Sequence, residues 1–346
     1  MSRRRGLADR RRVVGLSQER RLRLADALRL SVDELAVLLV RPAEIRSRPR
    51  EPASGDLAVM RSLRVADCQI GGGYLYPMIT AYLRDKAPSA GLSEMAGWMA
   101  HDAGDAGSAQ RHFMQAVNQA QAAGDHQMAA AAFASLSHLA VHQGRTEQAT
   151  AFAVLGGIQL DGRPHHPSIA ARVMAMRAGA DAAANDVEAC TRRLAEAERL
   201  LLGADDGAPA SPWAGAFDEA ALAAETARCL MRLGQFPAAE REAERILVLR
   251  PPERVRSRAF AYLMLASILV ARREIEAACA AVHQVLTTTR ALASVPVLHE
   301  LRRVEQQLTP FAGTRVAAET VTRVRADLAE RHAVAAALPL SRPGLP

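Results

Sequence analysis

The feature that most constrains this chain is a two-helix pattern that recurs about every 40 residues along it. The predicted turns between paired helices are Gly104, Gly144, Asn185, Gly234 and Arg273. Seven residues before each turn the side chain is small: Gly97, Ser137, Ala178, Ala227 and Ala266. Five residues after each turn it is small again: Ala109, Ala149, Cys190, Ala239 and Ala278. Small side chains let antiparallel helices cross closely, so the sequence predicts an all-α solenoid of stacked helical hairpins over residues 92–330.

One unit carries a familiar motif. The run Leu233–Ala239, Leu-Gly-Gln-Phe-Pro-Ala-Ala, with Pro251 after the second helix, resembles a tetratricopeptide repeat. The period exceeds the usual length of about 34 residues, so the units are tetratricopeptide-like. The resemblance implies that the first helix of each hairpin lines a concave groove that binds a protein or peptide.

The register of the repeats predicts which polar side chains face this groove. Trp and Arg are typical anchors of protein interfaces, and both types occur in the predicted set. The expected partner-binding residues are Glu94, Trp98, Asp102, His138, His142, Arg172, Arg228 and Arg232. An alternative for Trp98 is a packing role beside Tyr74 and Tyr76.

The same region contains a pattern that could bind a metal. His138 and His142 lie one helical turn apart, a spacing that can ligate zinc, and His101, Asp102 and Glu94 lie on the preceding first helix. Neither a cysteine nor a second histidine pair completes the set, so we interpret it as polar groove lining. The sequence also lacks a Gly-x-Ser-x-Gly turn and other catalytic patterns. We therefore expect no metal, no cofactor and no enzymatic activity.

Charge is concentrated at the start of the chain. Lys and Arg number 44 against 37 Asp and Glu, a net charge of +7. Residues 1–50 hold fourteen arginines against six acidic residues, so the rest of the chain is close to neutral. Such a basic segment attracts phosphate groups. The arginines expected to contact DNA without reading its sequence are Arg3, Arg4, Arg5, Arg10, Arg11 and Arg12.

This basic segment, residues 1–40, resembles the start of a lambda-repressor-like (Xre) helix-turn-helix domain. The run Leu16-Ser-Gln-Glu19 matches the opening of that family's second helix, and residues 24–39 resemble its closing helices. The recognition helix between them is missing. The helix expected at residues 32–40 offers Asp33, Glu34 and aliphatic residues, whereas a reading helix needs polar side chains aimed at base edges.

Three further segments complete the predicted organisation. Residues 41–55 form a proline-containing linker, residues 56–91 a helical connector, and residues 331–346 a tail. The connector contains Gly71-Gly-Gly73, which we interpret as a flexible corner between helices at 56–67 and 78–86, because no Gly-Lys-Ser/Thr follows it. This corner before helical repeats is similar to actinobacterial regulators that join a lambda-repressor-like head to tetratricopeptide-like repeats.

Localisation follows from two negative patterns. The four cysteines, Cys68, Cys190, Cys229 and Cys279, have no paired spacing, which favours a reduced cytoplasmic setting. No relevant apolar run reaches the roughly 20 residues that a membrane helix needs.

The sequence as a whole predicts a regulatory protein that binds a protein or peptide in its repeat groove. It is related to transcriptional regulators, and a homodimer is left open. The alternative is a working DNA-binding transcriptional regulator with a repeat-based effector domain.

Overall fold

The computed structural model describes residues 17–39, 54–84, 89–203 and 208–337. These residues form helices and contain no strand, and consecutive helices pack as neighbours. The predicted fold class, an all-α helical-repeat solenoid, is confirmed. The described chain divides into two compact units. Unit 1 comprises residues 1–60, 88–97 and 109–225, and unit 2 comprises residues 61–87, 98–108 and 226–346. The predicted boundaries of the basic segment, linker, connector, helical hairpins and tail are not tested by this division and stay a prediction.

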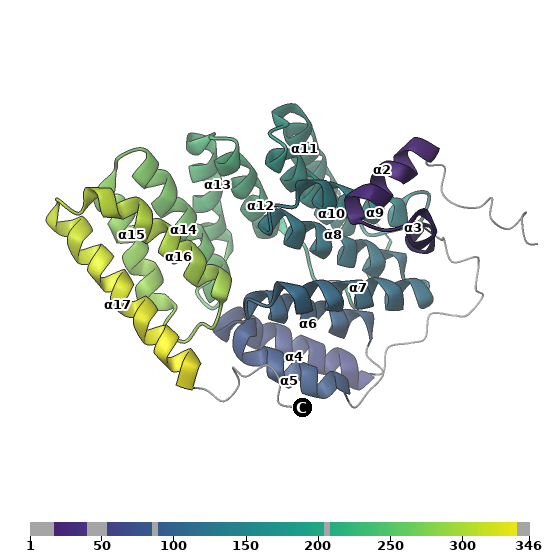
Figure 1. The fold of residues 1–346 in the computed structure, drawn as a ribbon, viewed down its shortest axis with the longest axis horizontal. Helices are drawn as coiled ribbons and strands as arrows, with labels where there is room; N and C mark the ends of the chain where they lie inside the picture. Colours follow the sequence, from purple (N-terminus) through teal and green to yellow (C-terminus); the bar gives the residue numbers. More distant parts are fainter. Residues whose placement is uncertain (1–16, 40–53, 85–88, 204–207, 338–346) are drawn as a thin grey trace, which may run out of the picture. The chain divides into compact units, whose positions relative to one another are not determined.

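Figure 1 labels the helices of the described chain. Those lying mainly in unit 1 are α2 (Gln18–Leu28), α3 (Val32–Leu39), α7 (Ala106–Ala122), α8 (His126–His142), α9 (Thr146–Leu160), α10 (Pro167–Ala183) and α11 (Val187–Leu202). Those of unit 2 are α5 (Gly72–Arg84), α13 (Phe236–Leu249), α14 (Val255–Ala271), α15 (Ile275–Thr288), α16 (Val295–Leu308), the 3-10 turn η3 (Thr309–Phe311) and α17 (Arg315–Ala337). Three further helices contribute residues to both units: α4 (Ser54–Ile70), α6 (Ala90–Asp102) and α12 (Glu219–Arg232). The first three residues of α7 also belong to unit 2.

All five predicted turns are confirmed by their backbone conformation. The residues with positive φ include Gly104 (85°), Gly144 (70°), Asn185 (58°), Gly234 (72°) and Arg273 (64°). At the second turn, the Gly144 N–H donates to Val141 O and the Arg145 N–H donates to Ala140 O, at 3.1 and 2.9 Å. The other four turns have the same pair of bonds. This is the Schellman motif, which satisfies the last carbonyls of a helix.

The small positions lie where paired helices cross. In unit 1, the Ser137 hydroxyl donates to the backbone oxygen of Ala149 at 2.8 Å, so it joins α8 directly to α9. A Cβ atom added to Gly97 would lie 2.4 Å from the ring of Phe113. In unit 2, Ala266 and Ala278 are fully buried in the core formed by α14, α15, α16 and α17. The predicted register of close crossings is therefore confirmed.

The short helices α2 and α3 pack against α9 in unit 1. Ser31 and Glu34 form a capping box at the start of α3, because each side chain accepts the backbone N–H of the other residue. The apolar face of α3 is buried through Leu35, Leu38 and Leu39. The Gln121 amide also donates to Leu38 O at 3.0 Å. The aliphatic residues of α3 thus pack against the rest of unit 1.

The triple-glycine corner differs from the sequence prediction. It is packed: Gly73 N–H donates to Ala293 O at 3.1 Å, and Ala293 N–H donates to Ile70 O at 2.8 Å. A Cβ atom at Gly71, whose φ is 84°, would lie 2.4 Å from Ala293 O. Glycine is needed here because two backbones meet, and the interpretation as a flexible corner is wrong.

Two helix ends also differ from the prediction. Helix α5 begins at Gly72, six residues before the predicted start at Met78. The Gly72 N–H donates to Oδ2 of Asp102 at 2.6 Å, so a carboxylate from α6 caps the start of α5. Helix α17 continues to Ala337, into the segment predicted as a tail.

Candidate functional site

The strongest polar cluster of unit 2 joins α4, α6 and α14. The Arg256 guanidinium donates to Asp67 Oδ1 and Oδ2 at 2.9 and 2.6 Å, and to Asp102 Oδ2 at 2.9 Å. The Ser294 hydroxyl donates to Asp102 Oδ1. Burial by itself would lower the pKa of Arg256, but the charges of both carboxylates outweigh it and the pKa is raised. The guanidinium therefore stays charged, and it neutralises one of the two carboxylate charges of the cluster.

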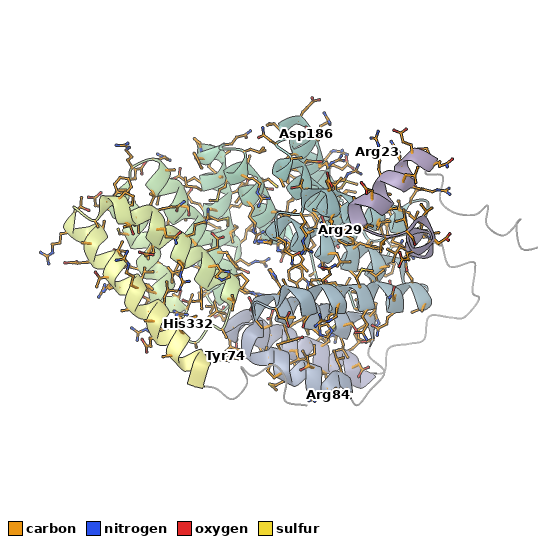
Figure 2. All side chains as sticks on the ribbon, viewed as in Figure 1. Arg23, Arg29, Tyr74, Arg84, Asp186 and His332 are labelled. Carbon is orange, nitrogen blue, oxygen red and sulfur yellow. The ribbon has the colours of Figure 1, made fainter. Side chains whose placement is uncertain are left out.

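A pocket of about 820 Å³ opens beside this cluster, within unit 2. Its lining residues come from the start of α5, the end of α6, the C-terminal part of α15, the start of α16, and α17. Tyr74 on α5 is one of the lining residues, and Figure 2 labels it. The figure also labels His332, which marks the last turns of α17. The apolar lining includes Leu286, Leu292, Val295 and Leu298. A pocket of this size matches sites for small molecules or for a few peptide side chains.

The charged groups of the pocket are partly neutralised by one another. Arg331 donates to both carboxylate oxygens of Asp327, and also to the backbone and side-chain oxygens of Thr289, which follows α15. Among the remaining ionisable lining residues, Arg290, Arg323 and Glu330 are exposed. Two arginines against one glutamate leave the outer pocket with a positive excess.

Four of the predicted groove residues lie in unit 2, and they differ in exposure. Asp102 is buried in the cluster with Arg256. Trp98 is half-buried, with its ring edge-on to His101 at 6.1 Å between centroids. Arg228 lies over the Phe260 ring at 6.0 Å. Arg232 is exposed in the last turn of α12. Trp98 is not among the pocket residues that include Tyr74 and Tyr76.

The other four lie in unit 1. Glu94 and Arg172 are buried and form an ion pair of 2.8 Å, and the Ser135 hydroxyl donates to the same Glu94 oxygen at 2.8 Å. Arg172 also donates to the Ser135 oxygen at 2.7 Å. These two charged residues thus connect α6, α8 and α10 internally. They do not present charge to a partner at the surface of this structure.

The histidine pair has a neighbour that sequence reasoning missed. The rings of His138 and His142 lie 4.3 Å apart between centroids. Nδ1 of His138 is 3.6 Å from Oε1 of Glu225 on α12. Within the described ranges, no three His, Cys, Asp or Glu residues are placed to hold a metal ion. His101 is packed into unit 2, and burial lowers its pKa, with Arg256 and Arg228 acting in the same direction against Asp102.

The predicted DNA-contacting arginines, Arg3, Arg4, Arg5, Arg10, Arg11 and Arg12, lie outside the described residues.

Comparison of the chain with protein-family models gives no match, and comparison with curated proteins gives none. In the described part of the chain, no helix is both long enough and apolar enough to cross a membrane. Function is therefore inferred from the geometry of each of the two units.

The pocket was missed by sequence reasoning, although one signal pointed to it. Gly71–Gly73 marks a close approach of two backbones, and the α15–α16 loop that it contacts supplies Leu292–Val295 to the pocket. The glycines do not indicate that the second backbone is the segment at Ala293. None of the four cysteines, all of which lie in the described ranges, forms a disulfide bond.

Proposed function

We propose that this protein is a cytoplasmic regulatory protein, related to transcriptional regulators, that binds a protein or peptide partner through its helical repeats. The observation that carries the proposal is the pocket of about 820 Å³ in unit 2. Repeat proteins of this kind commonly bind partners on surfaces built from several successive helices. Asp102 is the one predicted groove residue among the lining residues, so the proposed binding place lies mostly outside the set that the repeat register predicted.

The residues that line the pocket favour binding of a peptide over catalysis on a substrate. Apolar residues such as Leu286 and Leu298 can receive an aliphatic or aromatic side chain, and Arg290 and Arg323 can bind a neighbouring carboxylate. The lining histidine, His283, is within 3.2 Å of the Thr320 hydroxyl. The lining offers recognition groups, and its remaining carboxylates belong to the ion pairs described above or to the exposed Glu330.

A peptide library panned on the immobilised full chain provides the test. Ala326, an exposed lining residue of α17, can be changed to Trp so that the indole occupies the pocket without entering the core. We expect selected peptides to lose affinity for Ala326→Trp and to keep it for Ala195→Trp. Ala195 is a matched exposed alanine on α11 in unit 1. Peptides that bind all three proteins equally, or a selection that yields no peptide, would reject this pocket as the binding site.

The second candidate function is a DNA-binding transcriptional regulator. It is favoured by the exposed Arg20 and Arg23 of α2 and by the exposed Arg29, which directly follows that helix. Figure 2 labels Arg23 and Arg29. Helix α3 argues against recognition of a DNA sequence, because it buries its aliphatic residues against α9 and exposes Asp33 and Glu34. A footprint that defines one protected sequence at physiological salt would place this function first.

A further inference from the structure

Unit 1 contains a group of arginines that the proposed peptide site does not use. Arg177 lies on α10, Arg193 on α11 and Arg20 on α2. Helix α10 packs against α11 and α9, and α2 packs against α9. The charges of Arg193 and Arg20 both act on Arg177, together with that of Asp181. Three arginines and one aspartate leave an excess of two positive charges.

The single acid of the group is already engaged. The Asp181 carboxylate accepts a hydrogen bond from Nε of Arg193, in a pair that is mostly buried. Arg177 is half-buried, and its Nε is fully buried with no hydrogen-bond partner in the described structure. Leaving a charged donor without an acceptor is costly, because its lost hydration is not replaced. The pKa of Arg177 is lowered, first by burial and then by Arg193, so the group lacks negative charge.

The charge of Arg20 reaches Arg177 from α2, a helix that packs against the neighbouring α9. Arg20 is exposed, and in the described residues no hydrogen bond or ion pair involves its guanidinium; only its backbone N–H is used, in the cap with Ser17. The next residue, Arg21, also has a buried Nε without a hydrogen-bond partner. An exposed arginine whose charge acts on Arg177 suits a ligand that arrives from solvent.

We propose that Arg20 and Arg177, supported by Arg193, bind a phosphate group. The planar guanidinium donates pairs of hydrogen bonds that match phosphate oxygens. A phosphate monoester carries about −1.5 to −2 charges at neutral pH, which matches the excess of two positive charges, whereas one carboxylate would balance only half of it. The group can come from a small phosphorylated molecule, or from a nucleic-acid backbone, where two neighbouring phosphates with one negative charge each would be needed. The site is independent of the peptide pocket, since it lies entirely in unit 1.

The experiment compares the full chain with Arg20→Gln, Arg177→Gln and the control Arg192→Gln. Arg192 lies on α11 and is exposed in a pair with Glu188, so the control removes the same charge from a site outside the group. Calorimetry with inorganic phosphate is run at constant ionic strength, and anisotropy is measured with a short labelled DNA duplex. Circular dichroism checks the folding of each variant. If Arg177→Gln does not fold, the exposed Arg20→Gln decides.

We expect the dissociation constant to rise about tenfold or more in Arg20→Gln and Arg177→Gln, and to be unchanged in Arg192→Gln. A loss confined to phosphate identifies a small phosphorylated ligand. A loss confined to DNA, or shared by both probes, identifies a nucleic-acid backbone. Equal binding by all four proteins, or no binding of either probe by the parent chain, overturns the proposal.

Discussion

The hydroxyl of Ser137 donates a 2.8 Å hydrogen bond to the backbone oxygen of Ala149 across the crossing of α8 and α9. Ala149 is fully buried, and so is Ala239, the equivalent residue two hairpins later. A longer side chain at either position would hold the paired helices apart. Such contacts explain why the recurring positions are small.

We therefore expect Ala149→Leu and Ala239→Leu each to lower the free energy of unfolding by about 1–3 kcal/mol through overpacking. Urea denaturation followed by circular dichroism measures this. The control is Ala195→Leu, at an exposed position of α11, which should remain within about 0.5 kcal/mol of the parent. Parent-like stability of both buried variants would show that the crossings tolerate larger side chains.

Gly71 provides a test of the packed corner. Gly71→Ala places a methyl group against Ala293 O in addition to the strain of its positive φ. Gly124 has a similar φ of 72° and open space around it, so Gly124→Ala carries the backbone strain alone. We expect Gly124→Ala to cost about 1–2 kcal/mol and Gly71→Ala to cost more. Equal losses in thermal or chemical unfolding would contradict the close contact.

The Arg256–Asp102 pair should contribute far more than a surface pair. Asp102→Ala leaves the Arg256 guanidinium with one carboxylate partner and removes the cap of α5. Because Asp67 still pairs with Arg256, the cost stays below the roughly 3–5 kcal/mol of removing the sole partner of a buried charge. We expect about 2–3 kcal/mol, from the lost hydrogen bonds of Asp102 to Gly72, Arg256 and Ser294. Glu300→Ala, which removes the exposed pair with Arg303, should cost less than about 1 kcal/mol. Similar costs in urea titrations would refute this difference.

His101 makes stability depend on pH. Because burial lowers its pKa in the folded protein below the ordinary histidine value of 6.5, the unfolded chain binds a proton more readily. This contribution to stability is complete above the unfolded pKa and is lost as the pH falls through 6.5 toward the folded pKa. We expect His101→Gln to reduce the loss of unfolding free energy between about pH 7 and pH 5. The same slope in His101→Gln and in the parent would contradict the assignment, and His299→Gln, at an exposed position, serves as the control.

The candidate site could be predicted only in part. The repeat register correctly placed Glu94 and Arg172 on first helices, but it could not show that they pair with each other, because 78 residues separate them. His138 and His142 are neighbours on one helix, so their contact follows from spacing, whereas Glu225 comes from another hairpin. Helix periodicity gives the face of a side chain and leaves its partner undetermined.

The sequence by itself determined the all-α fold, the five hairpin turns and the small residues at the crossings. These are local properties. A Schellman turn such as that at Gly144 forms from six consecutive residues, and a close crossing of two helices needs only a small side chain at the crossing point. The tertiary structure alone decided that Asp102 caps α5, that Gly71 meets Ala293, and that a pocket opens between α5, α15 and α17. Such features depend on stacking between distant hairpins, where burial selects which charges pair and which backbones meet.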